Sequence, residues 1–274
     1  MVEAWSIPVH AKTADAVRAV WNAGAHGVLL HGPKGIGLRD VAGSLTTASP
    51  EVVYSIVPNK KNNITIKEIR ELYITLKTIN AQGRIVIIED AERMLEPAQN
   101  AFLKLLEEPP LGVRFVLLSH TPETLLATIR SRVQAVEVLP ITHAQSEALL
   151  DELGVMDATK RAQLLFIAEG LPAELTRLAQ DEDAFRQRAS IVRDARTFIS
   201  APVYERLKIA HAYKDSREAA LVLLDDSMKQ LHAAIAKTGD AHLVKRLDVF
   251  LEAHRAIKQN GVVRIQLAAT IMVQ

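Results

Sequence analysis

Residues 27–39 read GVLLHGPKGIGLR, an apolar run that leads into a glycine-rich loop and then into a possible helix start. This order is typical of phosphate-binding loops, and Gly32 and Gly37 have the G-x-x-x-x-G spacing of such loops. The next two positions should carry Lys and then Ser or Thr, but they carry Leu38 and Arg39. The stretch therefore predicts the fold of a nucleotide-binding domain that lacks the side chains for holding nucleotide.

The two missing side chains have separate tasks in a working loop. The Lys adds positive charge beside the outer phosphates, and the Ser or Thr hydroxyl ligates Mg²⁺. Leu38 offers no donor and Arg39 cannot ligate a metal, and each charge-assisted hydrogen bond lost is worth about 1.5–3 kcal/mol. We therefore expect Gly32, Gly35 and Gly37 to form a degenerate, non-functional phosphate loop. Backbone amides alone could still hold a nucleotide weakly, and a plain strand-to-helix turn is the alternative interpretation.

Apolar and amphipathic segments alternate through the first half of the chain. Further runs typical of strands occupy residues 52–57, 84–90, 114–120 and 133–140. Helical spacing is found over residues 17–24, 66–79, 97–110 and 123–132. This alternation predicts a parallel sheet with helices on both faces. After residue 140 the strand signal stops, so we expect an α/β domain over 1–140, three short helices over 141–182 and longer helices over 183–274.

The composition excludes several classes of protein. The 274 residues include 33 Lys and Arg against 32 Asp and Glu, so no bulk charge indicates a nucleic-acid or membrane partner. Because there is no cysteine, disulfides, thiolate metal sites and thiol nucleophiles are excluded together. No signal pattern opens the sequence, and no apolar run approaches the ~20 residues needed to span a bilayer. We expect a soluble cytoplasmic protein with no membrane partner.

Two acids, Glu89 and Asp90, follow the apolar run RIVII at residues 84–88. A nucleotide hydrolase keeps one acid here for Mg²⁺ and a second for the attacking water. The spacing from the glycine loop favours a degenerate Walker B pair, although a solvated loop start would look the same. The nine histidines show no H-E-x-x-H or comparable metal-binding spacing, so no metal ligand is predicted.

Two longer segments resemble one protein family. IVIIEDAERMLEPAQNAFLKLLEEPP (85–110) and FVLLSHTPETLLATIRSR (115–132) are similar to the clamp-loader branch of the AAA+ proteins. The similarity is strong over residues 25–180 and extends to the C-terminus by helix pattern only. It implies a RecA-like AAA+ domain over 1–140, a small helical lid over 141–182 and an all-α collar domain for oligomerisation over 183–274.

The resemblance also implies a functional residue. Ser131 and Arg132 match the family's Ser-Arg-Cys motif, with Val133 in place of Cys. In that family the arginine acts in trans as a finger that reaches ATP held by the neighbouring subunit. Arg130 is the nearest competitor for the role. Without the family, Arg132 would be interpreted as an exposed cation at a helix end.

Other family positions depart from an active ATPase. Glu89 and Asp90 occur in the reverse of the expected Asp-Glu order, and Ser119 and His120 occupy the position of the sensor 1 polar pair. The position matching the sensor 2 arginine is Ala173, while Arg177, one turn later, is given a surface role. The four-cysteine zinc module common in these proteins is absent, so neither zinc nor another cofactor is expected.

These features together predict a clamp-loader subunit of DNA polymerase III that does not hydrolyse ATP and is not itself an enzyme. Arg132 would complete an ATP site on an adjacent gamma/tau subunit. The expected partners are the gamma/tau and delta subunits and, through the complex, the sliding clamp and primed DNA. The alternatives are an active gamma/tau-type ATPase and an AAA+ scaffold outside replication. A delta subunit is a weaker alternative within replication.

Overall fold

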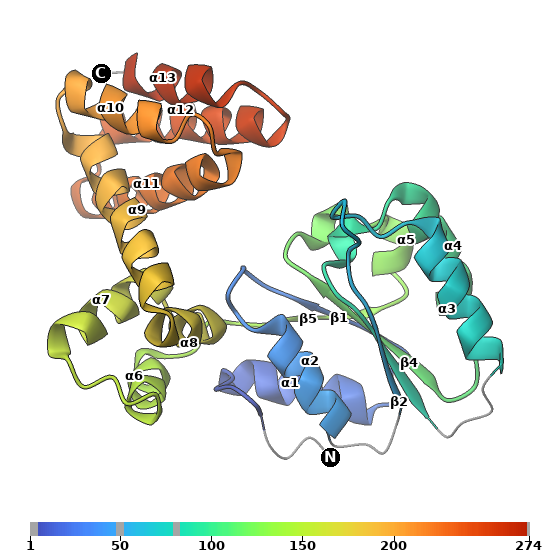
Figure 1. Ribbon diagram of the computed structural model, residues 1–274. Coiled ribbons are helices and arrows are strands. Elements are labelled where there is room, and N and C mark those ends of the chain that lie inside the picture. Colours follow the sequence, from blue (N-terminus) through green and yellow to red (C-terminus); the bar gives the residue numbers. More distant parts are fainter. Residues whose placement is uncertain (1–4, 48–51, 79–82, 273–274) are drawn as a thin grey trace. The chain divides into compact units, whose positions relative to one another are not determined.

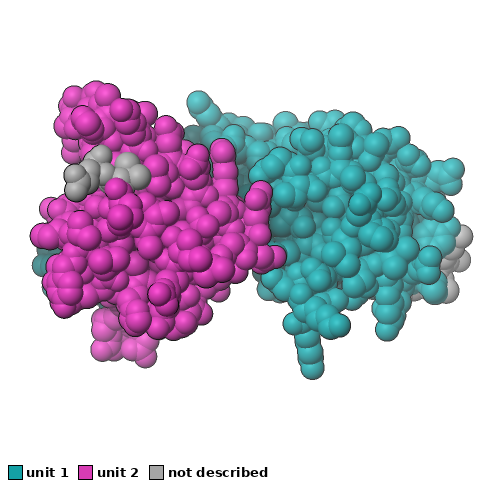
Figure 2. Space-filling model, turned by 90° about the horizontal axis from the view of Figure 1, so that it is seen from above, with its two compact units in different colours: residues 1–180 teal, residues 181–274 magenta. Residues whose placement is uncertain are grey.

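The computed structural model describes residues 5–47, 52–78 and 83–272 (Figure 1). The chain divides into two compact units, residues 1–180 and 181–274 (Figure 2). Residues 141–180 belong to the same compact unit as the sheet. The finer division into three domains stays a prediction.

A five-stranded sheet, with all neighbours parallel, organises the first unit in the order β2-β3-β4-β1-β5. The strands are β1 (Gly27–His31), β2 (Val52–Ile56), β3 (Arg84–Ile88), β4 (Val113–Ser119) and β5 (Gln134–Glu137). Each forms within one of the five apolar runs, apart from a one-residue extension of β4. Strand β1 lies between β4 and β5 and aligns Leu29 with Leu117 on β4 and with Ala135 on β5. The predicted parallel α/β fold is confirmed.

The two faces of this sheet carry separate hydrophobic cores, because successive side chains of a strand point to opposite faces. Leu30 and Val116 pack with α1 and α2, whereas Leu29 and Phe115 pack with α3 and α4 (Figure 1). Phe115 meets Phe102 of α4 edge-on, at a centroid distance of 5.2 Å. The four helices are α1 (Ala11–Asn22), α2 (Leu38–Thr47), α3 (Ile66–Thr78) and α4 (Glu96–Glu107).

The segment after β4 differs from the predicted helix over residues 123–132. It forms a 3-10 turn, η2 (Pro122–Thr124), and a four-residue helix, α5 (Ala127–Arg130). Between them, Leu125 and Leu126 have extended backbones, and Leu125 is buried in the core. The buried Gln99 side chain accepts a hydrogen bond of 2.8 Å from the Leu126 N–H. Tertiary packing of Leu125 therefore interrupts a segment that helical periodicity alone would continue.

Three further helices complete the first unit: α6 (His143–Glu152), α7 (Ala158–Ala168) and α8 (Pro172–Gln180). Thr142 and Gln145 form a capping box at the start of α6, which fixes where that helix begins. Between α7 and α8, Gly170 has a left-handed φ of +80°, and its carbonyl accepts a 2.9 Å hydrogen bond from Ile141. This turn brings the start of α8 back beside the end of the sheet segment.

The second unit is built from helices alone, in agreement with the loss of strand signal in the sequence. Its helices are α9 (Glu182–Ser200), α10 (Val203–Ala212), α11 (Arg217–Thr238), α12 (Ala241–Lys258) and α13 (Val263–Met272). Ser216 caps the start of α11 and Gly239, at φ +67°, ends it. Phe198 and Phe250 meet in the middle of its core, 5.7 Å apart. Within the described ranges, no helix is both long and apolar enough to cross a bilayer.

Candidate functional site around the degenerate phosphate loop

The glycine loop connects β1 to α2 through a turn that only glycines fit well. Gly35 and Gly37 have left-handed φ angles of +85° and +87°. At Gly32, a Cβ would lie 2.8 Å from the Val138 carbonyl oxygen, which is too close for any side chain. The structure thus places the three predicted glycines in one tight turn at the end of β1.

Atoms of the chain itself lie directly against this loop. The Gly35 carbonyl accepts a 3.0 Å hydrogen bond from the Glu174 N–H, in the first turn of α8. A Cβ on Gly35 would come within 2.7 Å of the Glu174 Cβ, and one on Gly37 would overlap the Ile7 side chain. Ala173 also lies against Gly37, 3.5 Å from that Cβ position. Ile7 and the start of α8 therefore cover the loop.

Leu38 is part of the core. Its side chain is only 4% exposed and packs in the same cluster as Trp21, Ile36 and Val41. A Lys at this position would have to leave that cluster before its ammonium could reach a phosphate, because burying an unpaired charge is very costly. The residue at the lysine position of the motif has become a packing residue.

Arg39 lies beside the acid pair. Its Nε is 3.4 Å from Glu89 Oε1, and the same carboxylate oxygen accepts a 2.9 Å hydrogen bond from the Ser55 hydroxyl. Asp90 has a left-handed φ of +46° and makes no side-chain capping bond to the following 3-10 helix η1 (Ala91–Arg93). Hence a guanidinium of this chain is positioned beside the first acid, where a hydrolase would use Mg²⁺. Across the described ranges, no cluster of three or more His, Asp or Glu could hold a metal.

Ser119 and His120 hold the end of β4 to the loop. Ser119 is fully buried, and its hydroxyl accepts a 3.2 Å hydrogen bond from the Thr121 N–H. His120 Nδ1 lies 2.8 Å from the Gly32 carbonyl oxygen, so the ring carries its proton on Nδ1 and donates it there. The His120 N–H donates to Glu92 Oε1 at 3.2 Å. The His120 ring therefore joins the end of β4 to the glycine loop, and Glu92 holds the His120 backbone.

The sensor 2 region has no arginine directed at the loop. Ala173 stands at the matching position, and Arg177 donates two 2.8 Å hydrogen bonds to the Glu174 carboxylate on its own helix. The Arg177 side chain is 52% exposed. Its guanidinium therefore forms a surface pair one turn along α8.

Arg132 lies in the turn between α5 and β5. Its Nη2 is 2.9 Å from Glu107 Oε1, at the last residue of α4, and its Nη1 donates to the Thr128 carbonyl at 3.1 Å. The Arg132 side chain is 39% exposed. Ser131 ends α5, and its hydroxyl donates to the same Thr128 carbonyl at 3.1 Å. Val133 is buried, so Arg132 lies between the end of α5 and a buried residue that precedes β5.

Two side-chain contacts at the site were not predicted from the sequence. The Arg39–Glu89 pair joins residues of different motifs, and no local signal indicates it. Glu107 pairs with Arg132, 25 residues further along the chain, and no partner was predicted for either residue. A signal for Glu107 existed, because a carboxylate at a helix C-terminus opposes the helix dipole and is best explained by a nearby cation.

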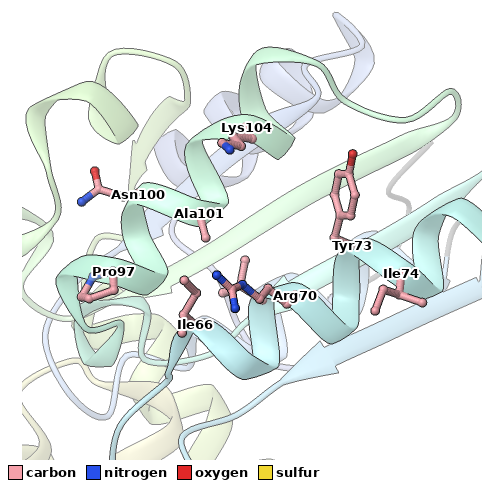
Figure 3. A pocket seen from close by; sticks show the side chains of 9 residues that line it. Ile66, Arg70, Tyr73, Ile74, Pro97, Asn100, Ala101 and Lys104 are labelled. Atoms are coloured by element: carbon pink, nitrogen blue, oxygen red, sulfur yellow. The ribbon is translucent and has the colours of Figure 1, made fainter.

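A separate hollow of about 660 Å³ lies between α3 and α4 (Figure 3). Its lining is mainly apolar, including Ile66, Tyr73 and Ile74, and its charged members are Arg70 and Lys104. It shares no residue with the glycine loop, the acid pair or Arg132. The chemistry predicted from the motifs therefore does not coincide with this hollow.

Comparison with known proteins gives a consistent result in sequence. Residues 46–142 match the family model described as "DNA polymerase III, delta subunit". The DNA polymerase III subunit delta' of Pseudomonas aeruginosa is 30% identical over 207 residues, covering 65% of this chain and 63% of that protein. The same-named Escherichia coli protein is 31% identical over 133 residues, 47% of this chain and 40% of that one. The chain thus spans less than two thirds of the length of these relatives.

A gamma/tau subunit of DNA polymerase III is also similar. The protein from Mycobacterium tuberculosis strain H37Rv is 32% identical over 133 residues, which cover 39% of this chain and 23% of that protein.

Solved structures share the fold. A gamma subunit-related protein of Thermotoga maritima superposes with a TM-score of 0.54 at 19% identity, covering 94% of this chain and 97% of that one. The RuvB Holliday junction branch migration motor of the same organism gives 0.51 at 17% identity, covering 94% and 85%. At such identities the likeness concerns fold alone, and it confirms the predicted fold of a parallel α/β domain followed by helices. The chain is therefore similar to the delta-prime subunits of DNA polymerase III in sequence and to AAA+ proteins in fold.

Proposed function

We propose that this chain is a clamp-loader subunit of the delta-prime kind, which hydrolyses no ATP and supplies Arg132 to ATP held by a neighbouring gamma/tau subunit. One observation carries the proposal, namely the contrast between the residues that follow the glycine loop and Arg132. Leu38, at the lysine position, is packed in the core, whereas the Arg132 side chain is 39% exposed at the surface. The chain has lost the means to hold a nucleotide and kept the means to reach one.

ATP hydrolysis at the neighbouring site requires a cation from outside the subunit that holds the ATP. Negative charge on the transferred phosphoryl oxygens must be stabilised in the transition state, and an arginine finger in trans does this in other nucleotide hydrolases. The gamma/tau and delta subunits would be the direct partners, with the sliding clamp and primed DNA engaged through the complex, in the cytoplasm. The chain itself would need neither zinc nor a nucleotide of its own.

The test is a reconstituted loader containing the gamma/tau and delta subunits and the Arg132→Ala variant. Turnover at the site completed by this chain should fall by about 10³-fold or more, which lowers the total DNA-stimulated ATPase by that site's share. Elution of the complex on size exclusion should not change. Arg130→Ala, an exposed arginine two positions away, is the matched control and should retain turnover. Wild-type turnover in the Arg132 variant would refute the finger.

The similarity to a gamma/tau subunit raises the alternative of an active ATPase. The loop geometry argues against it, because Ile7 and the start of α8 lie against Gly37 and Gly35. Magnesium-dependent ATP hydrolysis by the purified chain alone would favour that alternative.

A further inference from the structure

The Arg132 guanidinium is held at two points before any partner is present. Glu107 Oε1 lies 2.9 Å from Nη2, and the Thr128 carbonyl accepts from Nη1 at 3.1 Å. The two anchors come from different elements, the end of α4 and the short helix α5. A long side chain on the surface would otherwise sample many rotamers, so this pair of contacts selects one orientation.

Stability does not account for the choice of an acid at residue 107. Glu107 is the last residue of α4, where the partial negative charge of the helix end disfavours a carboxylate. Its ion pair with Arg132 is open to solvent, the side chains being 50% and 39% exposed, and such pairs contribute only about 0–1 kcal/mol. The carboxylate's main consequence is the direction in which Arg132 points.

We propose that Glu107 is a positioning residue for Arg132, an inference that rests on the function proposed for this chain. A guanidinium has five N–H donors; the hydrogen bond to the Thr128 carbonyl uses one on Nη1, and Glu107 forms an ion pair with Nη2. The remaining donors, Nε–H included, are available for phosphoryl oxygens while Glu107 stays bound. The finger thus meets the neighbour's triphosphate already oriented, which removes an ordering cost from the transition state.

The experiment places Glu107→Gln in the reconstituted loader with gamma/tau and delta. The kcat of DNA-stimulated ATP hydrolysis at the completed site should fall about tenfold, within the ~100-fold that a misplaced group can cost. The KM for ATP should stay unchanged, because ATP is held by the neighbouring subunit. Glu107→Asp keeps the charge and should recover part of the rate. Glu108→Gln removes an adjacent exposed acid at the same helix end and should behave as wild type.

Two further variants separate this inference from the proposed function. Arg132→Ala and the double variant Arg132→Ala/Glu107→Gln should be equally slow, because Glu107 acts only through Arg132. If Arg132→Ala leaves turnover intact, the finger itself is wrong. If Arg132→Ala is slow but Glu107→Gln matches wild type, or adds its own loss to that of Arg132→Ala, positioning is overturned and the finger stands.

A readout on the isolated chain checks orientation directly. The Arg132 Nε–H resonance should show greater side-chain mobility by NMR in Glu107→Gln than in Glu108→Gln, with circular dichroism confirming that both variants are folded. Equal mobility in the two variants would contradict the inference.

Discussion

At the scale of single residues, the two substituted positions of the glycine loop have acquired structural contacts. Leu38 fills the core beside Trp21, and Arg39 pairs with Glu89 of the former acid pair. Because both side chains contact neighbouring groups, replacing them with Lys and Thr would remove contacts as well as add functional groups.

The double variant Leu38→Lys/Arg39→Thr rewrites the loop as a complete phosphate-binding motif. We expect no Mg²⁺-ATP binding in a fluorescent-nucleotide titration, because Ile7 and α8 still cover the loop. Leu38→Lys alone should lower the free energy of unfolding by about 2–5 kcal/mol through loss of core packing and burial of charge.

Leu38→Met is the control for this pair, since it conserves volume and should cost less than about 1.5 kcal/mol. Urea denaturation followed by Trp fluorescence measures both effects, because Trp21 lies in the same cluster as Leu38. Nucleotide binding by the restored motif would show that the loop is merely missing its side chains.

At the scale of elements, the glycine loop and the start of helix α8 pack directly against each other. The backbone hydrogen bond from Glu174 to Gly35 and the close approach at Gly37 join segments that are far apart in sequence. Both glycines adopt a left-handed φ. Because glycine has no Cβ, other residues can pack directly against its backbone. In an active relative these glycines would bind phosphate. In this chain the start of α8 packs against them.

A pair of glycine substitutions tests this packing. Gly35→Ala places a Cβ 2.7 Å from the Glu174 Cβ at a φ of +85°, and should destabilise the first unit by about 1–3 kcal/mol. Gly43 lies in the interior of α2 with nothing within 4 Å of its Cβ position. Gly43→Ala should therefore stabilise by about 0.5–1 kcal/mol. Urea midpoints that shift in the same direction for both variants would contradict the contact.

At the scale of the whole molecule, each compact unit has its own core. The first unit has one core on each face of the sheet, and the second has a core within its helices. Both tryptophans, Trp5 and Trp21, belong to the first unit, so their fluorescence reports on that unit alone. Circular dichroism reports on both units, and the two signals together can assign a change in stability to one of them.

We expect Tyr213 to make the second unit sensitive to alkaline pH. Burial, and then a 2.7 Å hydrogen bond to Asp194, raise the pKa of its phenol above the ordinary value of 10.0. The folded state thus favours the protonated phenol. Its stabilising contribution is complete below pH 10.0 and is lost as the pH rises toward the raised folded pKa. Above pH 10.0 the helical circular dichroism signal should therefore be lost more easily on heating, while Trp fluorescence changes less.

Tyr213→Phe isolates the effect. The variant should lose about 1.5–3 kcal/mol near neutral pH, because a hydrogen bond to a charged group is removed, and should show a weaker alkaline decline. Tyr204→Phe, at a tyrosine that is 67% exposed in the same unit, should leave both properties close to wild type. An alkaline decline of full size in Tyr213→Phe would assign the sensitivity to another group.

The sequence by itself determined the class of the fold and most of its elements. Apolar runs of strand length placed all five strands, and the motifs over residues 85–132 indicated the AAA+ fold. These signals are local, because backbone geometry and solvent exposure repeat with the period of a strand or a helix. The spacing of glycines located the loop, and Leu38 and Arg39 marked it as degenerate.

Only the tertiary structure decided which side chains meet. The pairs Arg39–Glu89, Glu107–Arg132 and Gly35–Glu174 join separate motifs, and each depends on how strands and helices are ordered in space. Packing also split the predicted helix at 123–132, since burying Leu125 outweighed its helical periodicity. Periodicity records which face of an element is buried, but not which distant group will lie against it, because that follows from the assembled topology.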